Sequence, residues 1–190
     1  MQDSNEPADA ELIRAVGEGK REAFAALVRR HAASVRRLAL TLTSSEATAD
    51  DVVQDVYLSV WRHAKSFGGE GSARGWLLTI TRNAARRKAR RRAGEPAAAE
   101  PLDELAVCAG WGAASSAPDF ERALESRELL RQALARLSPE HQEVVTVIDL
   151  EGMSLAEGAT LLGLELPALK SRLHRARLRL LGAVKEVSQT

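Results

Sequence analysis

Apolar residues recur along most of the chain at steps of three and four positions, the period of helices that are buried on one face. Between residues 10 and 42 this pattern predicts two helices, because Gly17 and Gly19 interrupt it. A polar turn follows, and the next helix is predicted over residues 49–65, with Asp50 and Asp51 in its first turn. Its buried stripe is expected to consist of Val53, Val56, Tyr57, Val60 and Trp61.

The pattern continues after a glycine-rich loop at residues 67–72, with a long helix predicted over residues 73–92. Residues 93–122 break the periodicity with glycine, proline and acidic residues, which indicates a linker. A second helical block is predicted from about residue 120 to 187, where Pro139 suits the first turn of one helix. The sequence therefore predicts an all-α protein, with two small helical domains at 1–92 and 123–190 and a flexible acidic linker at 93–122 between them.

Residues 154–181 have the spacing of a helix-turn-helix. Ser154 and Glu157 fit a capping box, and Gly163 suits the turn. The inner stripe of the second helix is expected to comprise Leu169, Leu173, Ala176 and Leu180. Its outer face would present Lys170, Ser171, His174 and Arg175 to base edges, with Arg172, Arg177 and Arg179 near flanking phosphates. The alternative is a plain helical hairpin with a solvated basic face. Gly158, inside the first helix, is expected to cost about 1 kcal/mol relative to alanine.

The charges are segregated along the chain although their sum is close to zero. Among 190 residues, 27 are Lys or Arg and 26 are Asp or Glu, for a formal net charge of +1. Residues 74–92 contain eight basic residues and no acidic one, and residues 170–179 contain five and none. Residues 93–128 contain eight acidic and two basic residues, a local net charge of −6. Two basic segments separated by an acidic one predict two polyanion-binding surfaces.

The composition excludes several classes of protein. A single cysteine, Cys108, rules out an intramolecular disulfide and a cysteine-based zinc cluster. The four histidines show no metal-ligand spacing and no phosphate-binding glycine loop is present, so we expect neither an enzyme nor a cofactor. The chain has no signal-peptide pattern and no apolar run of about 18 residues. We therefore expect no membrane insertion and a cytoplasmic location.

The first basic segment has a second feature typical of nucleic-acid binding. Arg86, Arg87 and Arg90 fall on one helical face, and the helix that carries them follows a loop containing Phe67. Such a surface suits an unpaired strand, whose phosphates pair with arginine and whose bases need a pocket. Two alternatives remain. In the first, Trp61 and Trp76 are core residues rather than platforms on which bases stack. In the second, the basic residues only interact favourably with the helix dipole and bind no ligand.

Four strings carry a resemblance to a known family: residues 50–57 (DDVVQDVY), 60–64 (VWRHA), 75–83 (GWLLTITRN) and 169–177 (LKSRLHRAR). On these strings the chain resembles the extracytoplasmic-function sigma factors of bacterial RNA polymerase, over about residues 10–92 and 123–184. The resemblance implies a subunit that directs the polymerase core to specific promoters, and an anti-sigma factor as a further partner. The alternative is a stand-alone helix-turn-helix regulator that never contacts polymerase.

The resemblance also implies roles for individual residues. The residues expected to dock on the clamp of the polymerase core are Asp51, Gln54, Asp55, Leu58 and Arg62. Those expected at the minus-ten element, including the loop that captures a flipped base, are Phe67, Ser72, Arg74, Asn83, Arg86, Arg87 and Arg90. Those expected to read the minus-35 element in the major groove are Lys170, Ser171, Arg172, His174 and Arg175.

Overall fold

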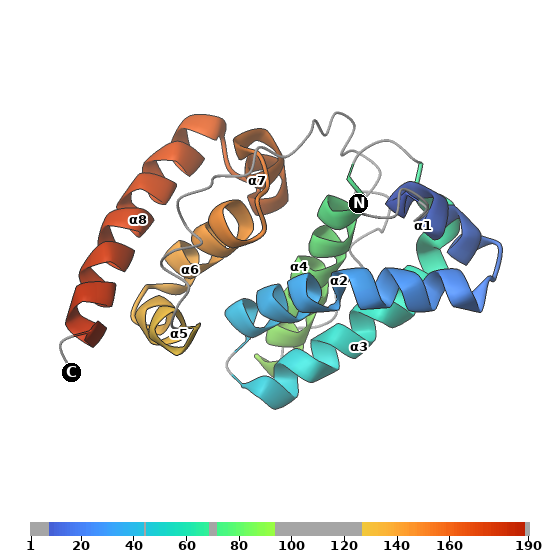
Figure 1. Cartoon of the computed structure of the whole chain (residues 1–190), viewed down its shortest axis with the longest axis horizontal. Helices are drawn as coiled ribbons and strands as arrows, with labels where there is room; N and C mark the ends of the chain where they lie inside the picture. Colours follow the sequence, from blue (N-terminus) through green and yellow to red (C-terminus); the bar gives the residue numbers. More distant parts are fainter. Residues whose placement is uncertain (1–7, 44, 69–71, 94–126, 189–190) are drawn as a thin grey trace, which may run out of the picture. The chain divides into compact units, whose positions relative to one another are not determined.

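The regular structure is helical throughout the described part of the chain, which confirms the predicted all-α fold (Figure 1). The computed structural model describes residues 8–43, 45–68, 72–93 and 127–188. The chain divides into two compact units, residues 1–112 and 113–190. Nearly all of the predicted linker, with Cys108, lies outside the described residues, and the exact domain bounds stay a prediction.

The first unit packs three long helices against one another. Its elements are α1 (Asp9–Gly17), α2 (Arg21–Leu42), α3 (Glu46–His63), the 3₁₀ turn η1 (Ala64–Ser66) and α4 (Ala73–Arg92). Helices α2, α3 and α4 contact each other pairwise, and α1 packs on both α2 and η1 (Figure 1). Their shared core is aliphatic, with Leu27, Val35, Val56 and Leu77 almost inaccessible to solvent. This core fixes α1 and η1 side by side.

Local signals set the helix boundaries of the first unit. The predicted break between the first two helices is confirmed, and Gly19 between them has a positive φ of 85°. Helix α3 starts three residues before its predicted start because Ser45 caps it, with the hydroxyl accepting from the Thr48 amide at 3.3 Å. Ser72 caps α4 in the same way, accepting from the Gly75 amide at 3.3 Å.

The predicted buried stripe of α3 is confirmed only in part, because Val53 and Tyr57 are half-buried and pack against the core. Val56 and Val60 are fully buried, together with Val52, which the stripe left out. Trp61 is instead 39% exposed. At 3.6 residues per turn it lies on the edge of the stripe nearest the polar face. Its ring makes an edge contact with Phe24, at 5.3 Å between ring centroids. The prediction that Trp61 is a core residue was wrong, whereas Trp76 is buried as expected.

The second unit arranges shorter helices around one long helix. Its elements are α5 (Arg127–Ala135), α6 (Pro139–Val145), the π-helical turn η4 (Thr146–Leu150), α7 (Leu155–Leu162) and α8 (Leu166–Ser188). Helices α5, α6 and α7 all pack on α8 (Figure 1). The predicted inner stripe of α8 is confirmed, since its members Leu169, Leu173, Ala176 and Leu180 are all buried.

Helices α7 and α8 form the predicted helix-turn-helix. The capping box is present: the Ser154 hydroxyl accepts from the Glu157 amide at 3.2 Å, and the Glu157 carboxylate accepts from the Ser154 amide at 2.7 Å. Gly163 ends α7 in the left-handed conformation, with φ 64°. Gly158 is more than a destabilising residue. A Cβ atom there would lie 2.3 Å from Cδ1 of Ile148, so a larger residue would have to displace this terminal methyl group.

Candidate functional site

The five residues predicted to dock on polymerase share one exposed face of α3. The members of this face, all exposed, are Asp51, Gln54, Asp55, Leu58 and Arg62. It lies opposite the buried stripe, as their spacing predicted. Lys88 of α4 contacts Asp51 at 2.7 Å. Its hydrogen bond and positive charge hold the pKa of the Asp51 carboxyl below the usual value, so this carboxylate is ionised and paired with Lys88 at neutral pH.

An apolar patch overlaps this face of α3 at Leu58 and extends to Trp61 at its edge. Leu58 is 46% exposed and Trp61 is 39% exposed, although both are large apolar side chains. Beside them Phe24 contacts Tyr57 edge to face, at 6.2 Å between ring centroids. The Tyr57 hydroxyl is buried without a hydrogen-bond partner among the described residues, and burial raises its pKa to about 12. An exposed apolar patch beside charged residues is typical of a protein-binding surface.

Phe67 and Ser72 lie where the chain enters α4, on the two sides of residues 69–71, which are outside the described residues. The Phe67 ring is half-buried and packs on Trp76, with ring centroids 5.2 Å apart at an angle of 54°. The main role of Ser72 in the structure is to cap α4. An aromatic ring with one side held by the core and the other open is suited to stacking a base.

Arg74, a predicted minus-ten residue, contacts the interior of the first unit. It is half-buried and donates to the Ser34 hydroxyl of α2 at 3.2 Å. His31 of α2 is buried and contacts Asp9 of α1 at 2.9 Å. Arg30 of α2 also pairs with Asp9. Burial, with the positive charges of Arg74 and Arg30, lowers the pKa of His31, although Asp9 opposes this. These contacts join three helices, so the structure gives Arg74 a packing role.

The remaining predicted minus-ten residues lie on the second half of α4. Arg86 is exposed, while Asn83, Arg87 and Arg90 are half-buried. Their spacing places them along one side of the helix. Arg90 lies about 24 Å from Arg74 along the helix, at 1.5 Å per residue. The structure therefore brings Phe67, Ser72 and Arg74 together at one end of α4 and the other four residues together nearer its C-terminal end.

The predicted minus-35 residues lie in the second and third turns of α8, most of them on its exposed face. Lys170, Ser171, His174 and Arg175 are all exposed, opposite the buried inner stripe. This is the face that a recognition helix presents to the major groove. Arg172 is half-buried and lies 3.5 Å from Glu140 of α6, so part of its charge is used within the unit.

Two further contacts of α8 concern charged residues. Arg177, expected near a flanking phosphate, holds Asp149 of η4 through two hydrogen bonds of 2.5 and 3.1 Å. Its hydrogen bond to Asp149 raises the pKa of the Arg177 guanidinium.

His141 of α6 was not predicted as a site residue. Burial lowers its pKa, and so do the nearby charges of Arg179, Arg175 and Arg172. Only the folded chain brings it beside the basic face of α8.

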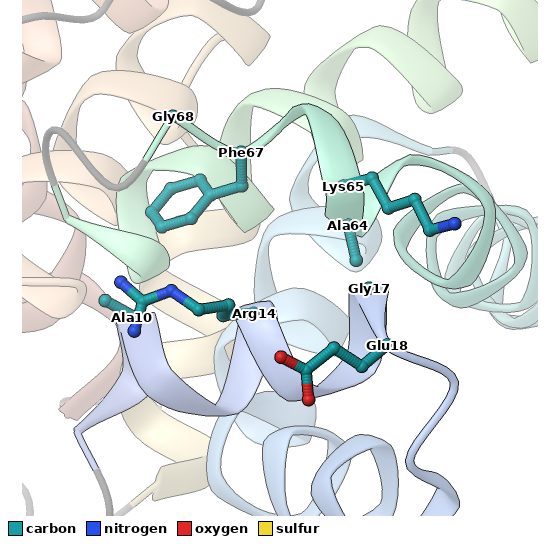
Figure 2. Close-up of a pocket in the computed structure, with 8 residues that line it drawn as sticks. All are labelled: Ala10, Arg14, Gly17, Glu18, Ala64, Lys65, Phe67 and Gly68. Atoms are coloured by element: carbon teal, nitrogen blue, oxygen red, sulfur yellow. The ribbon is translucent and has the colours of Figure 1, made fainter.

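A pocket of about 300 Å³ lies between α1 and the chain around η1 (Figure 2). Its lining residues are Ala10, Arg14, Gly17, Glu18, Ala64, Lys65, Phe67 and Gly68. Of these, only Phe67 was predicted to belong to a site. Arg14 is an exposed residue of a regular amphipathic helix, and no local motif distinguishes it from a solvated arginine.

Two kinds of site are not found in the ranges that the structure describes. Every helix there is too short or too polar to cross a lipid bilayer. Nor does this part of the chain gather three His, Cys, Asp or Glu side chains into a cluster able to hold a metal ion.

Comparison with protein families gives two matches in chain order. The Sigma-70 region 2 family matches residues 27–95, and the Sigma-70 region 4 family matches residues 127–180. The first match covers the α3 face and α4 but not α1, and the second covers the helix-turn-helix through most of α8. Together the two matches span more than half of the chain.

Relatives match over nearly the whole chain. The sigma factor SigM of Mycobacterium tuberculosis is 36% identical over 93% of this chain and 84% of its own length. CnrH of Cupriavidus metallidurans is 33% identical over 92% of this chain and 93% of its own. Among solved structures, CnrH in complex with the cytosolic domain of CnrY has a TM-score of 0.62, with 26% identity over 95% of this chain and 99% of that chain. RpoE of Bartonella quintana with the anti-sigma factor NepR has a TM-score of 0.64, with 29% identity over 85% and 96%.

Proposed function

Because the chain belongs to the extracytoplasmic-function sigma factors of bacterial RNA polymerase, we propose that its exposed α3 face docks on the clamp of the polymerase core while α4 and α8 hold promoter DNA. The chain is a non-catalytic initiation factor that directs polymerase to promoters. The α3 face carries the proposal of clamp docking, because five residues of mixed polarity are exposed together on it beside the apolar patch of Leu58 and Trp61. Polymerase acts in the cytoplasm, and we place this protein there.

Promoter contact is divided between the two units in this proposal. Phe67 and the basic side of α4 bind the strand opened at the minus-ten element, and the second and third turns of α8 read the minus-35 element. The segregated basic segments support this division, since each lies on a helix with an exposed face. A stand-alone regulator would need only the helix-turn-helix, and that alternative gives the first unit no function. The region 2 match over residues 27–95 therefore disfavours that alternative.

An anti-sigma factor is part of the proposal. Two relatives of similar fold were solved with a partner, RpoE with the anti-sigma factor NepR and CnrH with the cytosolic domain of CnrY. The apolar patch of Leu58 and Trp61 offers a protein partner a contact that competes with polymerase. We expect the two partners to exclude each other on this face.

Run-off transcription tests the proposed function. Purified core polymerase is incubated with genomic DNA fragments, with and without this protein, and the transcript starts are mapped. Discrete starts that require the protein are the expected result. If the protein neither produces such starts nor comigrates with core on a sizing column, the proposal is wrong.

A pair of matched variants tests the clamp-docking face within the same assay. Asp55→Ala removes a carboxylate from the face, whereas Asp50→Ala removes an exposed carboxylate of the same helix outside it. We expect Asp55→Ala to impair comigration with core and transcription, and Asp50→Ala to behave as wild type. Equal behaviour of the two variants would remove the support for this face.

A further inference from the structure

Lys88 lies in the basic segment of α4 but faces away from the side proposed for DNA. At about 100° per residue, it lies about 160° around the helix from both Arg86 and Arg90. Its ammonium group contacts the carboxylate of Asp51 at 2.7 Å, so Lys88 is on the side of α4 that packs against α3 (Figure 1). The positive charge of this residue is therefore used within the first unit.

The pair of Lys88 and Asp51 is held more firmly than the neighbouring pair on α3. The Lys88 side chain is only 29% exposed, whereas the Asp51 side chain is 57% exposed. Arg36 of α2 lies 3.6 Å from Asp50, and both of these side chains are largely exposed. Because the protein covers the stem of Lys88, the ammonium group is fixed in place. The carboxylate that it holds remains open to a binding partner.

Fixing this carboxylate changes what a binding partner meets. Asp51 belongs to the exposed α3 face, and its hydrogen bond to Lys88 keeps it ionised by lowering the pKa of the carboxyl. An exposed aspartate without such a contact samples several rotamers, and a partner that binds it must order it at a cost. With Lys88 in place, the folded chain has already ordered the group. Binding sites commonly lock their contact groups through supporting side chains of this kind.

We infer that Lys88 is a positioning residue for polymerase binding, which acts by holding the Asp51 carboxylate in the orientation that the clamp meets and makes no contact with promoter DNA. The inference rests on the proposed function, which places Asp51 on the clamp. The same contact has one other possible use, because a cation beside Asp51 also neutralises it. The two uses differ in sign. Loss of a positioning lysine weakens core binding, whereas loss of a neutralising lysine strengthens the attraction of this face for a basic partner.

The affinity of the full chain for purified core polymerase tests the sign. It is measured by fluorescence anisotropy of the labelled chain. Lys88→Gln should weaken core binding by about 2- to 10-fold, because the carboxylate must then be ordered on binding. Lys88→Arg can still donate to the carboxylate and should retain most of the affinity. Arg36→Gln is the matched control, because it breaks the neighbouring pair with Asp50, which lies outside the α3 face, and it should bind core as wild type does.

Two further measurements show whether Lys88 acts through Asp51. In the Asp51→Asn background, Lys88→Gln should cause no further loss of core affinity, so the two substitutions are not additive. The second measurement is the salt dependence with which holoenzyme, formed at saturating core, binds the single strand of the minus-ten element. Arg87→Gln should reduce the slope of log affinity against log salt by about 0.7, the loss of one phosphate contact. Lys88→Gln should leave that slope unchanged.

The outcomes separate this inference from the proposed function. If wild type binds core and gives promoter-dependent starts, but Lys88→Gln binds core as well as wild type or more tightly, the inference is wrong and the proposed function stands. The same conclusion follows if Lys88→Gln is equally harmful in the Asp51→Asn background, or if it lowers the salt slope as Arg87→Gln does. If wild type neither binds core nor gives such starts, both fail.

Discussion

Gly158→Ala tests how closely α7 approaches η4 in the helix-turn-helix. Two opposing effects determine the change in the free energy of unfolding. Alanine inside a helix is favoured over glycine by about 1 kcal/mol. Against this, the new Cβ would lie 2.3 Å from Cδ1 of Ile148, and overpacking of this kind costs about 1–3 kcal/mol. We therefore expect Gly158→Ala to change stability by between zero and about 2 kcal/mol, in the destabilising direction.

A second substitution removes the steric term. Ile148→Val deletes the Cδ1 atom and on its own costs about 0.5–1.5 kcal/mol. The atoms then nearest the new Cβ lie 3.5 Å away, an ordinary contact. In the Ile148→Val background, Gly158→Ala should therefore stabilise the unit by about 1 kcal/mol. The change in sign between the two backgrounds is the signature of the close approach.

Thermal unfolding of the full chain measures these effects. Trp61 and Trp76 lie in α3 and α4, so their fluorescence follows the first unit, and the helical circular dichroism signal follows both units. Gly182→Ala is the control, because Gly182 is an exposed residue of α8 with no atom within 4 Å of the added Cβ. It should raise the midpoint of the second unit by about 4–8 °C per kcal/mol gained. If Gly158→Ala in the wild-type background raises stability as much as Gly182→Ala does, the reasoning is refuted.

Three further predictions concern binding and pH. Asp55→Ala should weaken the binding of core polymerase on a sizing column and leave the binding of isolated minus-35 DNA unchanged. Arg175→Ala should weaken minus-35 binding in fluorescence anisotropy by about 1–3 kcal/mol if it contacts a base, whereas Lys185→Ala, an exposed charge near the end of the same helix, should change it far less. The pKa of His31 is lowered in the folded state, so the unfolded chain binds its proton more readily. Unfolding followed by tryptophan fluorescence should show full stability above pH 6.5 and a loss as the pH falls below that value, and His31→Gln should reduce this slope.

Local signals explain why most of the fold was predictable. The capping box of Ser154 and Glu157 and the left-handed turn at Gly163 involve neighbouring residues, so the sequence reveals them directly. Trp61 shows the limit of periodicity. Apolar residues cover a broad face of α3, and which edge of that face meets solvent is decided by packing against α2. Gly158 shows the same limit, because helix propensity is local whereas its contact with Ile148 depends on the folded unit.

The residues of the candidate site also differ in how far the sequence alone predicts them. Exposure of the α3 face and of the second and third turns of α8 follows from helical spacing, so these residues were predictable as groups. The pocket depends on α1 meeting η1 about 50 residues later in the chain, and no pattern in either segment announces it. The sequence therefore did not distinguish Arg14 from an ordinary solvated arginine.

The basic segment of α8 serves two purposes that its charge alone does not distinguish. Arg177 holds Asp149, whose side chain is only 10% exposed, and Arg172 lies beside Glu140. Both pairs connect α8 to the helix formed by α6 and η4, and so fix the direction of the exposed face. Lys170 and Arg175 project from that face into solvent. In the proposed arrangement the paired arginines set the orientation and the exposed ones remain for DNA, so a count of basic residues would overstate the number of contacts between this helix and DNA.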